Sequence, residues 1–332
     1  MRPSCLLQRI AFYAQPTAAW RAISSLYSGV IDVFDRRAKR RQKNRTCVGV
    51  DEDFTTYHYL RDEVAYRVVD RMRDVSRSFE LGLDLGCGHG HIVQHIDQYD
   101  MQQLVQCDLA EKVILTSHVH QAIPTTRLHV DEEFLPFKDN VFDVVLSSLS
   151  LHWVNDLPGS LQQICEVLKE DGCFIGSMFA TDTLYELRSS FLLAEQDREG
   201  GMGQHISPFT SMQDMGGLLT QSGFNLTTID IDDIVVNYPT MFELMKDLRR
   251  MGENNAVRRR RSYIPRETLI AAAAIYKTLY GNEDGSIPAT FRILSVIGWK
   301  PSKSQPQPAA RGSSVVSLKD LEEIVSNDRR KT

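Results

Sequence analysis

The sequence predicts an α/β protein built on a parallel sheet, and three observations carry this prediction. Apolar runs of strand length alternate with helical patterns through most of the 332 residues. A glycine-rich turn, Gly86–Gly90, follows the first of these runs. Acidic residues stand at the ends of the next two runs. In α/β sheets, ligands bind at the carboxyl ends of the parallel strands.

Seven runs have the length and composition of strands, and helical patterns lie between them. The predicted strands are Phe79–Leu85, Gln103–Cys107, Arg127–Val130, Val141–Ser147, Cys173–Met178, Phe224–Val236 and Ile287–Trp299. The first predicted helices are an amphipathic stretch from Leu60 to Val75 and a helix from Asn155 or Asp156 to the Lys169–Gly172 turn. Four more are predicted: 181–197, a helix that ends at Gln221, 241–251 and 266–280. The turn at Gly86–Gly90 is expected to open a helix.

Charge divides the chain into a basic start and an acidic body. Residues 1–45 carry a formal charge of +8, and the remaining residues carry −13. An acidic body is a poor partner for phosphate backbones, so no nucleic-acid partner is predicted. No acid occurs before Asp32, and spaced arginines lie among serines there, which is typical of a mitochondrial transit peptide.

The predicted organisation follows from these shifts in composition. The cluster RRAKRRQKNR, Arg36–Arg45, is interpreted as a solvated helix start or as a patch for acidic lipid or an acidic partner, in preference to a nuclear signal. Proline and small residues after Lys300 predict a mobile tail. The predicted segments are a transit peptide 1–35, a basic segment 36–50, a domain 51–300 with a helical insertion 239–281, and a flexible tail 301–332.

The glycine turn discriminates between two adenine cofactors. It reads GxGxG, whereas a dinucleotide site requires GxGxxG, and His91 stands where that pattern needs glycine or alanine. Asp84, just before the turn, would place a carboxylate where NAD has a diphosphate. A carboxylate suits an ammonium group, so S-adenosylmethionine is the predicted cofactor. Asp108 at the next strand end is expected to accept hydrogen bonds from the ribose hydroxyls.

These motifs resemble known families. LDLGCGHG, then Asp108, then DEEFLPFKDNVFDVVLSSLSLHW are similar to class I S-adenosylmethionine-dependent methyltransferases, and 131–156 resembles the malonyl-carrier-protein methyltransferase of biotin synthesis. Further strings, HISPF, VNYPTMFELM and NEDGSIPAT, resemble mitochondrial complex I assembly factors that hydroxylate an arginine of an iron–sulfur subunit. The resemblance covers nearly all of 33–312.

The resemblance implies a Rossmann-like, mostly parallel seven-stranded sheet with a helical insertion before the last strand. It also implies a protein at the matrix face of the inner membrane, whose partner is an iron–sulfur subunit in an assembly intermediate of complex I. The cofactor contacts that it implies are Asp84, Gly86, Gly88, Asp108, Leu109, Asp131, Glu132 and, beneath the methionyl end, Ser147–Leu149, which includes Ser148.

Catalytic residues are harder to assign. His152 and Tyr238 are candidates, and Tyr185, Glu186, Arg188 and His205 are further candidates for an acceptor pocket. Hydroxylation normally needs a redox centre. His129 and Asp131 match half of a non-haem iron site, but Asp131 already has a predicted cofactor role, and no metal is assigned. A methyltransferase acting on a protein or carrier protein, and a non-enzymatic assembly chaperone, stay open as alternatives.

Overall fold

A computed structural model describes residues 32–47, 54–75, 77–306 and 312. Of these residues, those through Pro301 form one compact unit, and those from Ser302 belong to a second. The fold and both sites described below belong to the first unit. No helix in these described ranges is long and apolar enough to cross a membrane.

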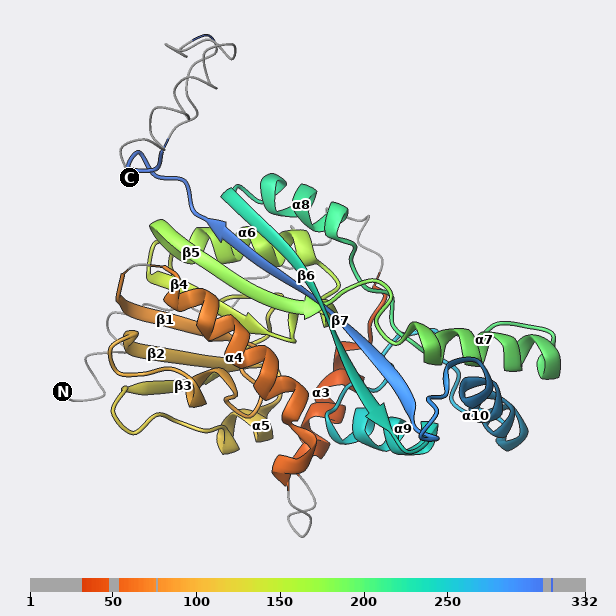
Figure 1. The fold of residues 1–332 in the computed structure, drawn as a ribbon. Coiled ribbons are helices and arrows are strands. Elements are labelled where there is room, and N and C mark those ends of the chain that lie inside the picture. The colour runs from red at the N-terminus through yellow and green to blue at the C-terminus, as the bar shows by residue number, and fades with distance from the viewer. Residues whose placement is uncertain (1–31, 48–53, 76, 307–311, 313–332) are drawn as a thin grey trace, which may run out of the picture. The chain divides into compact units, whose positions relative to one another are not determined.

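A seven-stranded sheet forms the centre of this unit, in the order β3-β2-β1-β4-β5-β7-β6 (Figure 1). Strands β1 to β5 pair in parallel, whereas β7 is antiparallel to both β5 and β6. The predicted fold class is therefore confirmed. The strands are β1 Phe79–Leu85, β2 Met101–Asp108, β3 Thr125–His129, β4 Phe142–Ser148, β5 Leu168–Phe179, β6 Asn225–Tyr238 and β7 Ile287–Trp299.

Helices cover both faces of the sheet because alternate apolar residues of the strands point to opposite sides. On one face, α4 (Tyr59–Arg73) packs with Phe79, Met101 and Val144. On the other, α6 (Leu157–Val167) and α8 (Met212–Gln221) pack with Leu83 and Phe174. Asp156 caps α6, where its side chain accepts a hydrogen bond from the backbone N–H of Gly159.

A helical extension gathers around one end of the long β6–β7 pair (Figure 1). The predicted insertion is present between these strands as α9 (Met241–Arg250) and α10 (Arg266–Tyr280). These helices pack with α7 (Tyr185–Glu199) around buried Tyr276 and Phe291. The extension provides a second apolar core beyond the edge of the sheet where β1 and β2 end.

Three local predictions were wrong. The glycine turn opens only the short 3-10 turn η2 (Ile92–Gln94), because Gly88 and Gly90 have left-handed φ values of +56° and +80° that a helix cannot contain. No helix joins β3 to β4, and the helix between β2 and β3 is the six-residue α5 (Glu111–Thr116). Helix α7 begins at Tyr185, later than predicted, since Leu184 has a φ of +54°.

The basic segment belongs to the fold instead of standing apart from it. Its helix, α3 (Arg36–Thr46), buries Lys39 and Lys43. Phe34, within the predicted transit segment 1–35, is buried edge-on against Trp153. Cleavage after residue 35 would remove this contact, so the structure places the boundary of the folded unit before Phe34. Residues 1–31, which carry the spaced arginines, lie outside the described residues.

Candidate functional site

Asp84 lies near the carboxyl end of β1, at the edge of the sheet where the other predicted cofactor contacts, Asp108 and Glu132, are also buried. Its side chain is 0% exposed, and neither carboxylate oxygen has a hydrogen-bond partner. Burial raises its pKa well above the usual value, and the nearby Asp108 carboxylate adds to the rise. An unpartnered buried carboxylate is costly to a protein, so its position indicates a cationic ligand.

The glycine turn brings backbone amides to the same edge. The N–H groups of Gly86 and Cys87 both donate to the carbonyl of Cys107, at 2.8 and 2.9 Å, which ties the turn to the end of β2. Gly86 has a φ of +75°, and a Cβ there would collide with the Ser150 hydroxyl. Glycine is therefore required at this position by both the backbone and the close approach of Ser150.

Asp108, at the end of β2, is fully buried and partly satisfied. Its Oδ1 accepts from the N–H of Ala110 at 2.8 Å, and its Oδ2 accepts from the N–H of Gly88 at 3.0 Å. The ammonium of Lys43, on α3, donates to the same Oδ2 at 2.7 Å. The structure thus places Asp108 beside the glycine turn, as a ribose ligand requires, and gives it a cationic neighbour.

Asp131 and Glu132 follow β3 and differ in exposure, 29% against 1% for their side chains. Arg36 donates to Asp131 Oδ1 at 2.6 Å and also to Glu132 Oε2. Burial would raise the pKa of Glu132, but Arg36 and Lys43 outweigh it and lower the pKa to about 2. Glu132 is therefore a buried, ionised carboxylate held by two cations, whereas Asp131 is partly exposed.

The remaining predicted contacts also lie at this edge. Leu109 is buried beside Asp108. The hydroxyl oxygen of Ser148, at the end of β4, is buried without a hydrogen-bond partner. Orphaned polar atoms on β1 and β4, together with the carboxylates of β2 and the β3–β4 loop, fit the ammonium and ribose of S-adenosylmethionine.

Helix α3 crosses this site, which the sequence did not predict. Arg36, Lys39 and Lys43 form one face of the helix, and each contacts a carboxylate of the site. Lys39 Nζ lies 3.2 Å from Glu253 and 3.4 Å from the centre of the Trp153 ring, and it donates to the carbonyl of Gly252 at 2.7 Å. The spacing of these three cations on one helical face is the signal that could have indicated burial.

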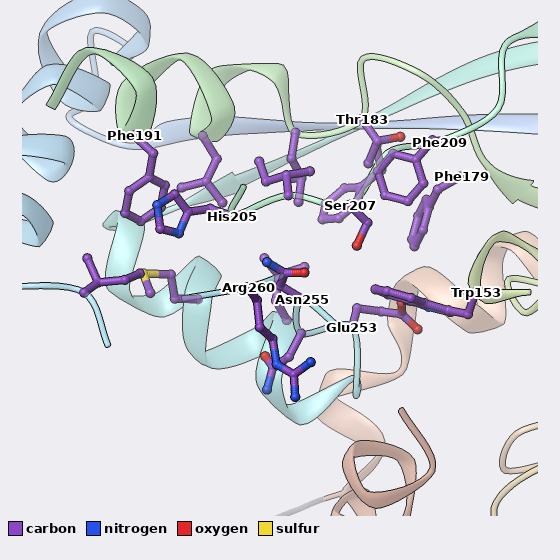
Figure 2. A pocket seen from close by; sticks show the side chains of 18 of the residues that line it. Trp153, Phe179, Thr183, Phe191, His205, Ser207, Phe209, Glu253, Asn255 and Arg260 are labelled. Atoms are coloured by element: carbon purple, nitrogen blue, oxygen red, sulfur yellow. The ribbon is translucent and has the colours of Figure 1, made fainter. Parts of the chain in front are cut away.

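A cavity of about 270 Å³ lies beyond Trp153 (Figure 2). Figure 2 shows Phe179 and Phe209 above the Trp153 ring, and Asn255 and Arg260 on the wall opposite His205. The cavity is mainly apolar and aromatic with a few polar groups, which is typical of a pocket for an organic side chain. Its lining comes from the end of β5, from α7, from the 205–209 segment, from α9 and from the 253–264 segment.

Glu253 connects this cavity to α3. Its carboxylate accepts hydrogen bonds from Trp153 Nε1 at 2.7 Å and from the guanidinium of Arg61, and it faces His152 Nε2 at 3.3 Å. Burial would raise its pKa, but Lys39 and Arg61 outweigh burial and hold the pKa far below the usual range. Two buried cations therefore depend on one carboxylate in the cavity wall.

The two catalytic candidates lie in different places. His152 is buried between Trp153 and Phe179, next to the cavity, and burial lowers its pKa to about 4, so the ring is neutral near pH 7. Its geometry suits a residue that positions Glu253. Tyr238 is hydrogen-bonded to Tyr59 and is not among the residues that line the cavity.

Of the other acceptor candidates, only His205 lines the cavity. It stacks on Phe191 at 4.6 Å and faces Glu195 Oε1 at 2.7 Å. The other three do not contribute to the lining: Tyr185 is exposed against Tyr280, Glu186 bonds Thr290, and Arg188 lies elsewhere on α7.

His129 and Asp131, which match half of a non-haem iron site, have other partners in the fold. His129 Nε2 faces the carbonyl of Leu109 at 2.8 Å, while Asp131 pairs with Arg36. Within the described ranges, no group of three or more histidine, cysteine or carboxylate side chains is arranged to hold a metal ion.

The parallel sheet, the glycine turn and the acids at successive strand ends define a class I methyltransferase-like protein. A family model described as a methyltransferase domain matches residues 83–176. A solved structure, of a putative methyltransferase from Bacillus halodurans, has a TM-score of 0.51 and 17% identity over 71% of this chain and 99% of that one. This likeness shows the fold.

Closer relatives identify the family. The chain is 53% identical to "Arginine-hydroxylase NDUFAF5, mitochondrial" of Danio rerio, over 92% of this chain and 94% of that protein. A malonyl-[acyl-carrier protein] O-methyltransferase of Methylovorus is 30% identical over 73% of this chain and 82% of that protein. The chain belongs to the family of mitochondrial arginine hydroxylases built on a methyltransferase-like fold.

Proposed function

We propose that the protein is a mitochondrial arginine hydroxylase that binds S-adenosylmethionine and acts on an iron–sulfur subunit during assembly of complex I. The 53% identity to an arginine hydroxylase along nearly the whole chain is the observation that carries the activity. The buried, unpartnered Asp84 carboxylate supports the cofactor. The target and its place in complex I rest on the resemblance of the downstream motifs.

Cofactor and acceptor would occupy adjacent spaces. S-adenosylmethionine is a cation whose sulfonium carries a transferable methyl group. Asp84 would hold its ammonium, Asp108 its ribose, and Asp131 with Leu109 its adenine. The cavity beyond Trp153 would take the arginine side chain, because aromatic faces attract a guanidinium and apolar walls exclude water from it. Oxygen and an electron donor are additional reactants.

Mass spectrometry of the target subunit tests the activity. In mitochondria that lack this protein, reintroducing the chain is expected to add one oxygen atom to one arginine of the subunit. An added methyl group would instead identify a methyltransferase, and restored assembly without any mass change would identify a chaperone. The Asp84→Asn variant is the matched control and is expected to leave the subunit unmodified.

The same function requires delivery to the matrix, and the relatives' mitochondrial names support it. We expect residues 1–31 to direct a fused reporter to mitochondria, because this segment has basic residues and no acids. A cytosolic reporter would contradict the transit prediction. Import that persists after Arg2, Arg9 and Arg21 are changed to Glu would contradict its electrostatic basis.

Contact with the inner membrane is proposed through the outward face of α3. Arg37, Arg40, Arg41 and Arg45 are exposed, whereas Arg36, initially grouped with them, contacts Glu132 of the proposed cofactor site. Each exposed arginine near an anionic bilayer contributes about 1 kcal/mol. We expect binding to cardiolipin-containing vesicles to be lost in an Arg37/Arg40/Arg41→Gln variant and at high salt. Vesicle binding that resists both changes would contradict this attachment.

A further inference from the structure

One face of α3 supplies a cation to each part of the site. Arg36 pairs with Asp131 and Glu132, and Lys39 pairs with Glu253. Lys43, whose side chain is 7% exposed, contacts Asp108, the carboxylate that we propose binds the cofactor ribose. These ion pairs fix one face of α3 against the carboxylates that the proposed cofactor would contact.

Asp108 does not have enough acceptor positions for all its partners. A carboxylate offers about four lone-pair positions. Three are used, by the N–H groups of Ala110 and Gly88 and by the Lys43 ammonium. The two hydroxyls of a ribose need two positions, and one is left. The backbone donors are fixed by the glycine turn and by the start of α5, so Lys43 is the partner that can leave.

A second carboxylate lies within reach of the same ammonium. Lys43 Nζ is 3.6 Å from Glu132 Oε1, against 2.7 Å from Asp108 Oδ2. Glu132 Oε1 accepts one hydrogen bond, from Ser150 at 2.9 Å, and has room for another. A small movement of the flexible lysine side chain therefore exchanges one carboxylate for the other.

The balance of buried charges also favours a Lys43 ammonium that stays beside these carboxylates. Asp84, Asp108 and Glu132 are buried carboxylates, and Arg36 and Lys43 are the cations that contact this group. S-adenosylmethionine carries one net positive charge, which balances the set only if Lys43 stays. Expulsion of the ammonium would leave an uncompensated buried charge, which is unfavourable.

We propose that Lys43 and the cofactor ribose compete for Asp108, and that cofactor binding transfers the Lys43 ammonium to Glu132. This inference rests on the cofactor assigned above. It makes Lys43 a residue that lowers affinity for the ribose while it preserves the charge balance of the bound state.

Calorimetry with adenosine tests the competition, because adenosine has the ribose but no charge. Lys43→Met is expected to bind adenosine about fivefold more tightly than the unchanged protein, the gain of one exchanged hydrogen bond. Lys43→Arg, which keeps the charge and the donor, is expected to show no gain. Arg40→Gln, on the exposed face of the same helix, is the matched control for altered helix charge.

The effect of Lys43→Met on adenosine affinity should depend on Asp108. This dependence separates competition for Asp108 from other effects of the substitution on the site. In an Asp108→Asn background, Lys43→Met is expected to change adenosine affinity little. Unchanged or weaker adenosine binding by Lys43→Met, with thermal unfolding showing a folded protein, would overturn the exchange while S-adenosylmethionine binding still stands. Failure of the unchanged protein to bind either ligand would instead overturn the cofactor assignment and the exchange together.

Discussion

Asp84→Asn is expected to weaken S-adenosylmethionine binding about 100-fold and to stabilise the cofactor-free protein. The affinity falls because the variant loses a charge-assisted contact to the cofactor ammonium, worth about 3 kcal/mol. The free protein gains because the wild-type carboxylate is 0% exposed and has no hydrogen-bond partner. When an empty ligand site lowers the stability of a protein, a substitution there is expected to raise stability and lower ligand affinity together.

The pH dependence of the stability gain has a definite sign. Burial raises the pKa of Asp84 in the folded protein above 3.8, so the folded state holds this proton more tightly than the unfolded state. The cost of the ionised carboxylate is absent below the unfolded pKa and is fully present above the folded pKa. Thermal unfolding of both proteins should therefore show a stability difference that grows as pH rises. A variant less stable than the wild type at high pH would contradict the assignment of Asp84 as an unpartnered carboxylate.

Glu253→Gln is expected to lower the free energy of unfolding by about 3 to 5 kcal/mol. The substitution leaves Lys39 and Arg61 buried without the carboxylate that both contact. Chemical denaturation measures the effect, and Glu80→Gln, whose side chain is 69% exposed, is the matched control. Adding Lys39→Met is expected to recover part of the loss, because it removes one of the two uncompensated charges.

A loss below about 1 kcal/mol for Glu253→Gln would mean that α3 is not held by buried ion pairs. The same pairs set the acid response. The pKa of Glu253 lies below its usual 4.5 in the folded protein, so its contribution is present above that value and is lost as pH falls through the folded pKa. The variant should therefore lack part of the wild-type loss of stability in acid.

The sheet, and the meeting of acidic residues at one of its edges, were predictable because the signals for each strand are local. Apolar runs mark each strand, and β1 and β7 have the predicted bounds. The neighbouring positions of Asp84 and Asp108 were predictable because parallel strands bring their carboxyl ends to one edge, whatever the distance between them in the chain. Late strand β6 and helices α9 and α10 follow from periodicity in the same way.

The role of α3 was not predictable in this way, because its burial depends on charges far away in the sequence. Lys43 contacts a residue 65 positions later, and Lys39 contacts one 214 positions later. Apolar periodicity, the main sequence signal, is missing from a helix whose buried face is basic. Burial of such a face becomes visible only when the partner carboxylates are placed in space.

The acceptor candidates on α7 show a smaller limit. The left-handed residue Leu184 sets the start of this helix. With this start, the side chains of Leu184, Leu187 and Phe191 line the cavity, and those of Tyr185 and Arg188 do not. Sequence spacing identifies the helix, but a one-residue uncertainty in its start rotates every side chain by about 100°.

Calorimetric titration of the purified protein with S-adenosylmethionine and with NAD shows which of the two cofactors it binds. The proposed site has the buried, unpartnered Asp84 carboxylate for an ammonium group, and its glycine turn is not the GxGxxG that a diphosphate requires. We expect saturable binding of one S-adenosylmethionine per chain, reduced about 100-fold by Asp84→Asn, and no binding of NAD. Absence of S-adenosylmethionine binding, an affinity that Asp84→Asn leaves unchanged, or binding of NAD at the same site would rule out the proposed cofactor site.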